Sequence, residues 1–445
     1  MKRLTAGLTT GLAALIFLLL LLSGCTIRSG SPQVVENGET VNESPSPEEQ
    51  KTYSPETSHT VIKTEKETKK ENTSEPEKAE EAVKPEKEEQ TEQKTKEKSE
   101  DIQPGEETMN EIEKIVASMS VEQKIGQLMA IPLHSELLGV EDKNHISERY
   151  YGNTFLFAAS CGDLDKLIAL NKECKALIEE KTGLSPMVFI DQEGGRVKRI
   201  KHGIVSLPAA AEMGKMTEDE VYKLAYTLGL ELMAFGITVD AAPVLDVFTN
   251  PENTVIGDRA FGTDVGTVTS KGLAFMKGLT DAGITACVKH FPGHGDTSQD
   301  SHTELATLSH DMKRLEEVEI APFRAAVEAG CEMMMTAHIY SSVMCKDGYP
   351  ASMSADVYRY IRETLGFDGV IVTDALDMKA VSETYGSAEA ALKAIQNGAD
   401  LLCACDSYEK QNQIYDRLLE AVKTGELSME RVDEAVGRIV KLKMK

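Results

Sequence analysis

The segment between residues 289 and 302 carries an unusual concentration of reactive side chains. Its sequence, KHFPGHGDTSQDSH, contains three histidines, one lysine and two aspartates in fourteen residues, and it follows the apolar run Ile284 to Val288. An apolar run that changes to Lys-His and then to Pro-Gly is typical of a buried strand that opens into a loop. The segment therefore predicts a loop at a strand end, which is where α/β enzymes keep their catalytic groups.

This loop could bind a metal ion or transfer protons. His290, His294, Asp300 and His302 are side chains of the types that coordinate metals. However, a proline and a glycine separate the first two histidines, and this excludes the helical HxxxH arrangement of zinc sites. A metal site in a non-helical loop stays open as an alternative.

Polar side chains follow other apolar runs of the chain in the same way. They are Asp191, Gln192, Glu193 and Arg196 after residues 187–190, Asp246 after 238–242, His338 after 333–337, and Asp374 and Asp377 after 370–373. Each of them alone could be a helix cap or a surface charge. Because a barrel directs the carboxyl ends of all its strands to one face, five strands that end in this way predict one shared site.

The elements that must position these residues alternate between strands and helices. Eight candidate strands lie at residues 126–131, 154–158, 187–190, 238–242, 285–288, 333–337, 370–373 and 401–405, and amphipathic helical patterns lie at 164–180, 218–235, 267–282, 312–329, 388–397 and 418–443. This order predicts an α/β fold, a single (β/α)8 TIM-type barrel. A doubly wound sheet is disfavoured because the Gly-x-Gly at 293–295 lacks the third glycine of a dinucleotide-binding loop.

Glycoside hydrolysis fits this set of residues better than metal chemistry. The reaction needs a carboxylate that attacks the anomeric carbon and a donor that protonates the leaving oxygen. Asp374, at the end of a strand, is the candidate nucleophile, and His302 is a candidate proton donor. Asp300 is close enough in sequence to accept the other ring N–H of His302. On spacing alone, however, the triplet at 300–302 is better explained as a capped turn.

Six segments of the chain share the motifs of one known enzyme family. They are KHFPGHGDTSQDSH at 289–302, DQEGGRVKR at 191–199, APVLD at 242–246, VIGDRAFG at 255–262, MTAHI at 335–339 and VTDALDM at 372–378. In this order they resemble the β-N-acetylglucosaminidases of glycoside hydrolase family 3, whose loop pattern is K-H-F-P-G-H-G followed by D-[ST]-H. The resemblance spans nearly the whole globular part of the chain.

The resemblance implies a role for each matching residue. It implies that Asp374 is the nucleophile, that His302 is the general acid/base and that Asp300 orients His302. The residues that it implies for holding the terminal N-acetylglucosamine are Asp191, Arg199, Arg259, Lys289 and His290. The family mechanism is retaining and needs no metal or other cofactor.

The resemblance also implies the class of substrate. Family members of this type act on muropeptides and other cell-wall fragments with terminal β-linked N-acetylglucosamine, in peptidoglycan turnover. Longer members carry a second α/β domain, whereas this chain ends directly after the predicted barrel. Three alternatives stay open: a β-glucosidase, a β-hexosaminidase of chitin oligosaccharides, and a sugar-binding lipoprotein that does not cleave.

The amino-terminal part of the chain predicts export and anchoring. Residues 1–24 have a basic start and a Leu-rich core, as in a signal peptide, and Leu-Ser-Gly before Cys25 resembles the lipobox in which that cysteine is lipidated. Residues 25–108 are rich in Glu, Lys, Thr and Pro, which predicts a disordered tether. The catalytic barrel would then cover residues 109–445, held by its lipid on the outer face of the cell membrane.

Composition narrows the range of partners. The net charge of −25, with no basic stripe, argues against nucleic acid as a partner. The absence of Trp favours a small pocket that binds one terminal sugar through hydrogen bonds, and therefore exo-action.

Seven cysteines follow Cys25 without any CxxC pair, so no disulfide framework is expected. The Cys-x-Cys at 403–405 places both thiols on one face of a strand, which favours packing in the core.

Overall fold

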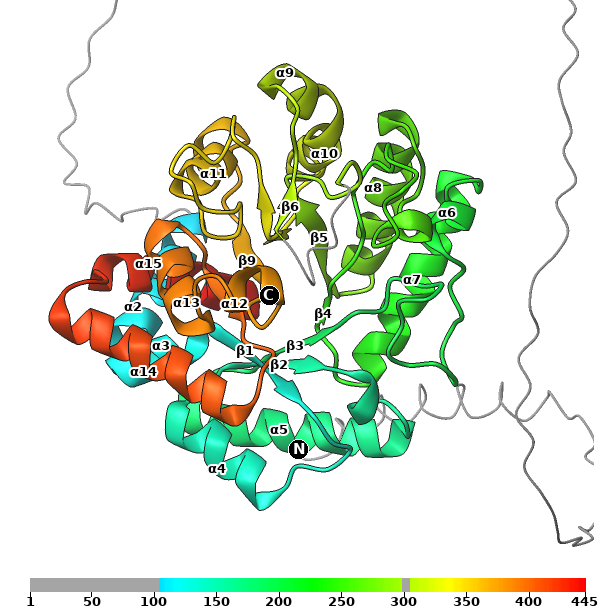
Figure 1. Cartoon of the computed structure of the whole chain (residues 1–445). Helices are drawn as coiled ribbons and strands as arrows, with labels where there is room; N and C mark the ends of the chain where they lie inside the picture. The colour runs from blue at the N-terminus through cyan, green and yellow to red at the C-terminus, as the bar shows by residue number, and fades with distance from the viewer. Residues whose placement is uncertain (1–103, 298–304) are drawn as a thin grey trace, which may run out of the picture. The chain divides into compact units, whose positions relative to one another are not determined.

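The computed structural model describes residues 104–297 and 305–445 (Figure 1). The predicted signal peptide, Cys25 and the tether as far as residue 103 lie outside the described residues, as do Asp300 and His302. Helix α2 (Pro104–Ser118) begins before the predicted domain boundary at residue 109. None of the helices in the two described ranges has the length and apolar character that a membrane crossing requires.

Eight parallel strands form a closed barrel, which confirms the predicted (β/α)8 architecture. The order around the barrel is β1, β10, β9, β7, β5, β4, β3 and β2. The strands are β1 (Met129–Leu133), β2 (Asn153–Leu156), β3 (Met187–Ile190), β4 (Val239–Asp240), β5 (Thr285–Phe291), β7 (Met333–Thr336), β9 (Val370–Ala375) and β10 (Leu401–Cys403). Every neighbouring pair in the barrel is parallel.

The barrel strands are short and almost wholly buried. All residues of β3, with the sequence MVFI, and of β7, with the sequence MMMT, are buried. Helices cover one face of these strands, and the other face lines the barrel interior. Because both faces are buried, the sequences of these strands are continuous apolar runs. β4 is shorter than predicted because the chain soon reaches Pro243, which has no N–H to donate to a ladder.

The helices surround the barrel as an outer layer (Figure 1). Besides α2 they are α3 (Val121–Gln127), α4 (Val140–Arg149), α5 (Leu164–Thr182), α6 (Ala210–Met213), α7 (Glu218–Ala234), α8 (Val265–Asp281), α9 (Met312–Arg314), α10 (Ala321–Glu328), α11 (Ala355–Arg359), α12 (Lys379–Ser382), α13 (Ser387–Asn397), α14 (Tyr408–Thr424) and α15 (Met429–Lys443). Ser120 and Thr217 begin α3 and α7 with capping boxes, in which each side chain accepts a backbone N–H of the first turn.

Some predicted boundaries were wrong. The strand expected at 126–131 starts inside α3, and a Cβ at Gly126 would lie 2.2 Å from the Tyr150 carbonyl oxygen, so this glycine allows a close backbone approach. The single helix expected at 312–329 is α9, a π-helical turn (Leu315–Glu319) and α10. A second sheet of β6 (Ala306–Thr307) and β8 (Ile339–Tyr340) was not expected, because two-residue strands carry no periodicity.

Candidate active site

A cavity of about 620 Å³ opens at the carboxyl ends of the barrel strands. It is lined by all six of the predicted site residues that the structure describes, namely Asp191, Arg199, Arg259, Lys289, His290 and Asp374. Asp191 and Arg199 follow β3, and Arg259 precedes α8. Lys289 and His290 lie in β5, and Asp374 lies in β9. The fold therefore brings side chains from distant parts of the sequence into one cavity, as the polar strand ends predicted.

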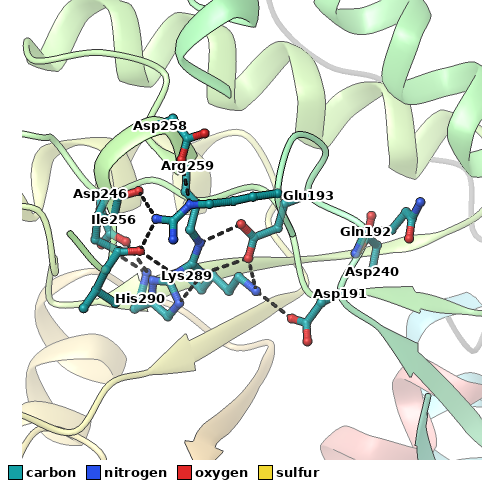
Figure 2. Close-up of polar contacts among 12 residues, drawn as sticks. Asp191, Gln192, Glu193, Asp240, Asp246, Ile256, Asp258, Arg259, Lys289 and His290 are labelled. Atoms are coloured by element: carbon teal, nitrogen blue, oxygen red, sulfur yellow. Dashed lines mark hydrogen bonds and ion pairs between the residues drawn. The ribbon is translucent and has the colours of Figure 1, made fainter. Parts of the chain in front are cut away.

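Lys289 is the centre of a buried charge network (Figure 2). Its Nζ lies 2.8 Å from Asp191 Oδ1 and 2.7 Å from Glu193 Oε1. Burial alone would lower the pKa of Lys289, but the two carboxylates raise the pKa above its ordinary value. The ammonium group is therefore kept charged in the cavity wall.

Arg199 is fixed in the wall by the segment that follows β3. Its Nη2 lies 2.6 Å from Asp191 Oδ2, and its guanidinium carbon lies 5.6 Å from the centre of the Phe157 ring. Gln192 Oε1 accepts the backbone N–H groups of Arg199 and Ile200 at 2.9 and 3.1 Å, which fixes the local backbone. In the described part of the chain, Arg199 Nε is buried without a hydrogen-bond partner, whereas the side chain as a whole is 28% exposed.

Arg259 connects the charge network to His290. Arg259 Nε and Nη2 each lie 2.8 Å from a carboxylate oxygen of Glu193. Nη2 also lies 3.2 Å from His290 Nε2. Because a guanidinium only donates, this ring nitrogen accepts, and the ring proton lies on Nδ1, 2.7 Å from Asp246 Oδ2 (Figure 2). His290 is thus held in one tautomer and one orientation.

Two carboxylates that organise this site were not among the predicted site residues. Burial would raise the pKa of Glu193, but Lys289 and Arg259 hold the pKa far below its ordinary value. The pKa of Asp246 is also lowered, because His290 beside it and the backbone N–H of His294, 2.7 Å from Oδ1, outweigh burial. Both residues were noted as polar strand ends, but their position in the sequence does not reveal which side chains they orient.

Asp374 lies in the cavity near the end of β9 and is partly exposed. Its Oδ1 accepts the backbone N–H of Ala375 at 2.8 Å. Burial raises the pKa of Asp374. His338, His290, this N–H and Lys289 together lower the pKa by more than burial raises it, so the pKa lies below the ordinary value. Asp374 is therefore ionised at neutral pH, which is the state that a nucleophilic carboxylate needs.

The metal site that the sequence left open is not tested by the structure, because two of its four candidate ligands, Asp300 and His302, lie outside the described residues. Between residues 104 and 297 and between 305 and 445, no three His, Cys, Asp or Glu side chains are arranged to hold a metal ion. Burial lowers the pKa of His294 to about 4, and its ring Nδ1 lies 2.8 Å from the Thr297 hydroxyl oxygen. This neutral ring is part of the cavity wall.

Residues 120–442 match the family model described as the glycosyl hydrolase family 3 N terminal domain. The chain belongs to glycosyl hydrolase family 3. Beta-hexosaminidase A from Pseudoalteromonas piscicida is 34% identical to it over 324 residues, which are 67% of this chain and 54% of that relative. Beta-hexosaminidase LpqI from Mycobacterium tuberculosis is 37% identical over 279 residues, which are 60% of this chain and 71% of the relative.

Solved structures of family 3 proteins share this barrel. A family 3 β-N-acetylglucosaminidase from Paenibacillus has a TM-score of 0.72 and 37% identity, over 74% of this chain and 62% of that chain. The structure of M. tuberculosis LpqI has a TM-score of 0.68 and 32% identity, over 75% and 96%. The chain spans about half the length of the Pseudoalteromonas relative (54%). The prediction that the chain belongs to glycoside hydrolase family 3 is confirmed.

Proposed function

We propose that this family 3 protein is a retaining exo-β-N-acetylglucosaminidase of the EC 3.2.1.52 type. The observation that carries the proposal is the ionised, partly exposed Asp374 in the same cavity as the cations of Arg199 and Lys289. Such a carboxylate can attack an anomeric carbon, and fixed cations beside it can bind sugar hydroxyl groups. The names of the two β-hexosaminidase relatives support a hexosaminide as the substrate.

The proposed reaction passes through a covalent glycosyl-enzyme. An Asp374 oxygen attacks the anomeric carbon, the bond to the leaving oxygen breaks, and His302 gives that oxygen a proton. Water then attacks the same carbon, gives a proton to His302, and releases the sugar from Asp374. Asp300 accepts the other ring N–H of His302 and so fixes its tautomer. The roles of His302 and Asp300 rest on the sequence resemblance, since both lie outside the described residues.

The terminal sugar would bind to the charged wall of the cavity. Lys289 uses two of its three N–H groups on Asp191 and Glu193, which leaves one for a sugar hydroxyl. The partly exposed guanidinium of Arg199 can supply a second donor. Asp191 is ionised and can accept from a hydroxyl group, because burial raises its pKa less than Lys289 and Arg199 lower it. A cavity of about 620 Å³ suits one or two sugar units, which fits exo-action.

We further propose that the natural substrates are peptidoglycan fragments, including muropeptides, and that the enzyme acts while anchored to the outer face of the cell membrane. The signal-peptide pattern and the lipobox before Cys25 support this location. Chitin oligosaccharides are the main alternative substrates. Hydrolysis rates on purified muropeptides and on chitobiose decide between them, and a preference for chitobiose would contradict the cell-wall proposal.

The activity is tested with chromogenic aryl glycosides. The wild-type chain should hydrolyse the aryl β-N-acetylglucosaminide but not the β-glucoside. Asp374→Asn, which keeps the shape of the side chain but removes the nucleophile, should lower kcat by about 1,000-fold or more. Asp416→Asn serves as the control, because Asp416 is exposed on α14 in a surface ion pair with Arg149.

Each other outcome selects a different function. Equal hydrolysis of the glucoside would favour a β-glucosidase. Binding of N-acetylglucosamine without any turnover would favour the sugar-binding lipoprotein. A wild-type rate in Asp374→Asn would show that Asp374 is not the nucleophile.

A further inference from the structure

A hairpin at the edge of the cavity carries an arginine that the proposed reaction does not use. Gly194 and Val197 exchange two backbone hydrogen bonds at 3.1 and 3.0 Å, so the two residues between them form the tip of a tight turn after β3. Gly195 is the first tip residue and has a φ of +53°, and a Cβ there would lie 2.8 Å from Ala209 Cα. The backbone that carries the second tip residue, Arg196, is therefore fixed.

Arg196 joins this hairpin to a second segment of the chain. Its Nε lies 2.7 Å from Asp258 Oδ1. Its Nη2 lies 3.1, 2.7 and 3.0 Å from the backbone carbonyl oxygens of Thr254, Val255 and Ile256. A single ion pair of an exposed arginine contributes little, and the Arg196 side chain is 47% exposed. Four contacts from one guanidinium therefore indicate that Arg196 holds the two segments together.

The two segments that Arg196 joins form one part of the cavity wall. Both line the cavity that holds Asp374, the hairpin through Arg196 and Val197 and the second segment through Thr254 and Val255. The ion pair and the three carbonyl contacts run between them. A ligand therefore cannot pass between the hairpin and the second segment without breaking the contacts of Arg196.

This closed part of the wall lies across the barrel from the proposed nucleophile. β3, which precedes the hairpin, is the fourth strand from β9 in either direction around the ring of eight strands. Asp191 and Arg199, which we propose to hold the sugar, also follow β3. A pyranose whose C1 is attacked by Asp374 has its C4 at the opposite corner of the ring. The C4 hydroxyl therefore points toward the end of β3, where a preceding sugar of a longer glycan would have to leave the cavity.

We propose that Arg196 determines exo-specificity by closing the cavity beyond the C4 hydroxyl of the terminal sugar. This inference rests on the proposed glycosidase function and adds the residue that limits its substrates. A substituent on the C4 oxygen would displace the Arg196 guanidinium and break its four contacts, so the wild-type protein should reject sugars substituted there. The unsubstituted end of a glycan fits the cavity, whereas an internal position of the same glycan does not.

The test compares an aryl β-N-acetylglucosaminide with the same glycoside methylated on its C4 oxygen. The kcat/KM of the wild type should be at least about 100-fold lower on the methylated substrate. In Arg196→Ala this ratio should fall by at least about tenfold, which corresponds to about 1.4 kcal/mol of lost discrimination. A general structural defect would lower both rates and leave the ratio unchanged, so an unchanged ratio would overturn the proposal.

Arg359→Ala is the matched control. Arg359 is also exposed and pairs with Asp356 on α11, but it does not line the cavity, so this variant should keep the wild-type ratio. If Arg196→Ala does not fold, Asp258→Ala removes the carboxylate end of the bridge and should also lower the ratio. A wild-type ratio in a folded Asp258→Ala would then overturn the proposal.

Failure of the proposed function gives a different result. If the wild type hydrolyses neither glycoside, the glycosidase proposal fails, but calorimetry with N-acetylglucosamine and its 4-O-methyl ether still tests Arg196. The wild type should bind only the unsubstituted sugar, and Arg196→Ala should bind both. Equal binding of the two sugars by the wild type would overturn the inference about Arg196, whether or not the glycosides are hydrolysed.

Discussion

Glu193 shows how one buried carboxylate can serve two cations. It contacts both Lys289 and Arg259, and its side chain is only 5% exposed. Removing one member of such a group leaves a buried charge without an opposite charge beside it. This lowers the free energy of unfolding by more than the loss of a surface ion pair does. Glu193 is therefore a positioning residue for the side chains that we propose to bind the sugar.

We predict that Glu193→Gln lowers the free energy of unfolding by about 3 kcal/mol. KM should also rise, because Lys289 and Arg259 lose the charge that orients them. Chemical denaturation and steady-state kinetics measure the two effects. Glu212→Gln removes an exposed pair with Lys215 and should change stability by less than about 0.5 kcal/mol. Equal effects of the two substitutions would contradict the role of Glu193.

Asp240 is a carboxyl group that the fold keeps protonated. It is fully buried in β4, its Oδ1 accepts the Gln192 backbone N–H at 2.9 Å, and its Oδ2 has no partner among the described residues. Burial raises its pKa to about 8. An unfolded chain loses this proton above about pH 4. Asp240 therefore contributes stability below pH 4, and this contribution is lost as the pH rises toward 8.

We predict that Asp240→Asn removes this pH dependence. Between pH 5 and pH 8, the stability of the variant relative to the wild type should rise by up to about 1.4 kcal/mol for each pH unit. Thermal unfolding of both proteins across this range measures the difference. Asp281→Asn, at an exposed ion pair with Lys277, should show no such trend. A constant difference between Asp240→Asn and the wild type would mean that Asp240 is ionised in the fold.

At the scale of elements, the loop after β5 is fixed at both of its described ends. Asp296, just before the undescribed residues, accepts from the Thr249 hydroxyl at 2.5 Å and contacts His310 Nε2. His310 lies beyond β6, on the other side of the segment that contains Asp300 and His302. The contact between Asp296 and His310 therefore sets the distance between the two ends of that segment.

We predict that His310→Ala lowers kcat by about tenfold with little change in KM, because the proposed proton donor is less well placed. The loss should be larger for alkyl glycosides than for nitrophenyl glycosides, since a poor leaving group needs protonation. His202→Ala, at an exposed position, is the control. An equal loss on both classes of leaving group would indicate a general structural defect instead.

Strands were predictable from the sequence where a buried strand is encoded by a continuous apolar run. The prediction for β3 matches all of Met187–Ile190 because parallel strands buried on both faces need such a run. The same rule failed at Gly126, where a short apolar stretch belongs to a capped helix. β6 and β8 are paired by tertiary contacts between residues 33 positions apart, which no local pattern records.

The same limit applies to the site. Polar residues after the strands predicted the cavity, and all six described candidates line it. Glu193 binds Arg259, which is 66 residues away, and Asp246 binds His290, which is 44 residues away. Such pairings follow from the closed barrel and not from spacing. The spacing of the cysteines at 403 and 405, in contrast, predicted core packing, and Cys403 lies in the core with Cys405 packed against it.

At the scale of the whole molecule, the anchor stays a prediction. Cys25→Ala should move the protein from the membrane fraction to the medium, or leave an uncleaved precursor, because the lipid chains that would hold it are lost. Cell fractionation followed by immunoblotting measures the shift, with Cys174→Ala, in α5, as the control. An unchanged distribution of Cys25→Ala would exclude lipidation at this residue.

Helix α2 packs on the outside of the barrel near the end opposite to the cavity. It lies beside α15, and the groove between them is lined by Ile112, Val116 and Arg438. Arg438 also borders a depression formed by Glu332 and Gly369, which immediately precede β7 and β9 and so mark the amino ends of the strands. A resin, a tag or a fusion partner joined at residue 104 would therefore hold the barrel by the end opposite to the cavity. The protein can be immobilised in this orientation with its cavity open to the terminal sugar of a substrate.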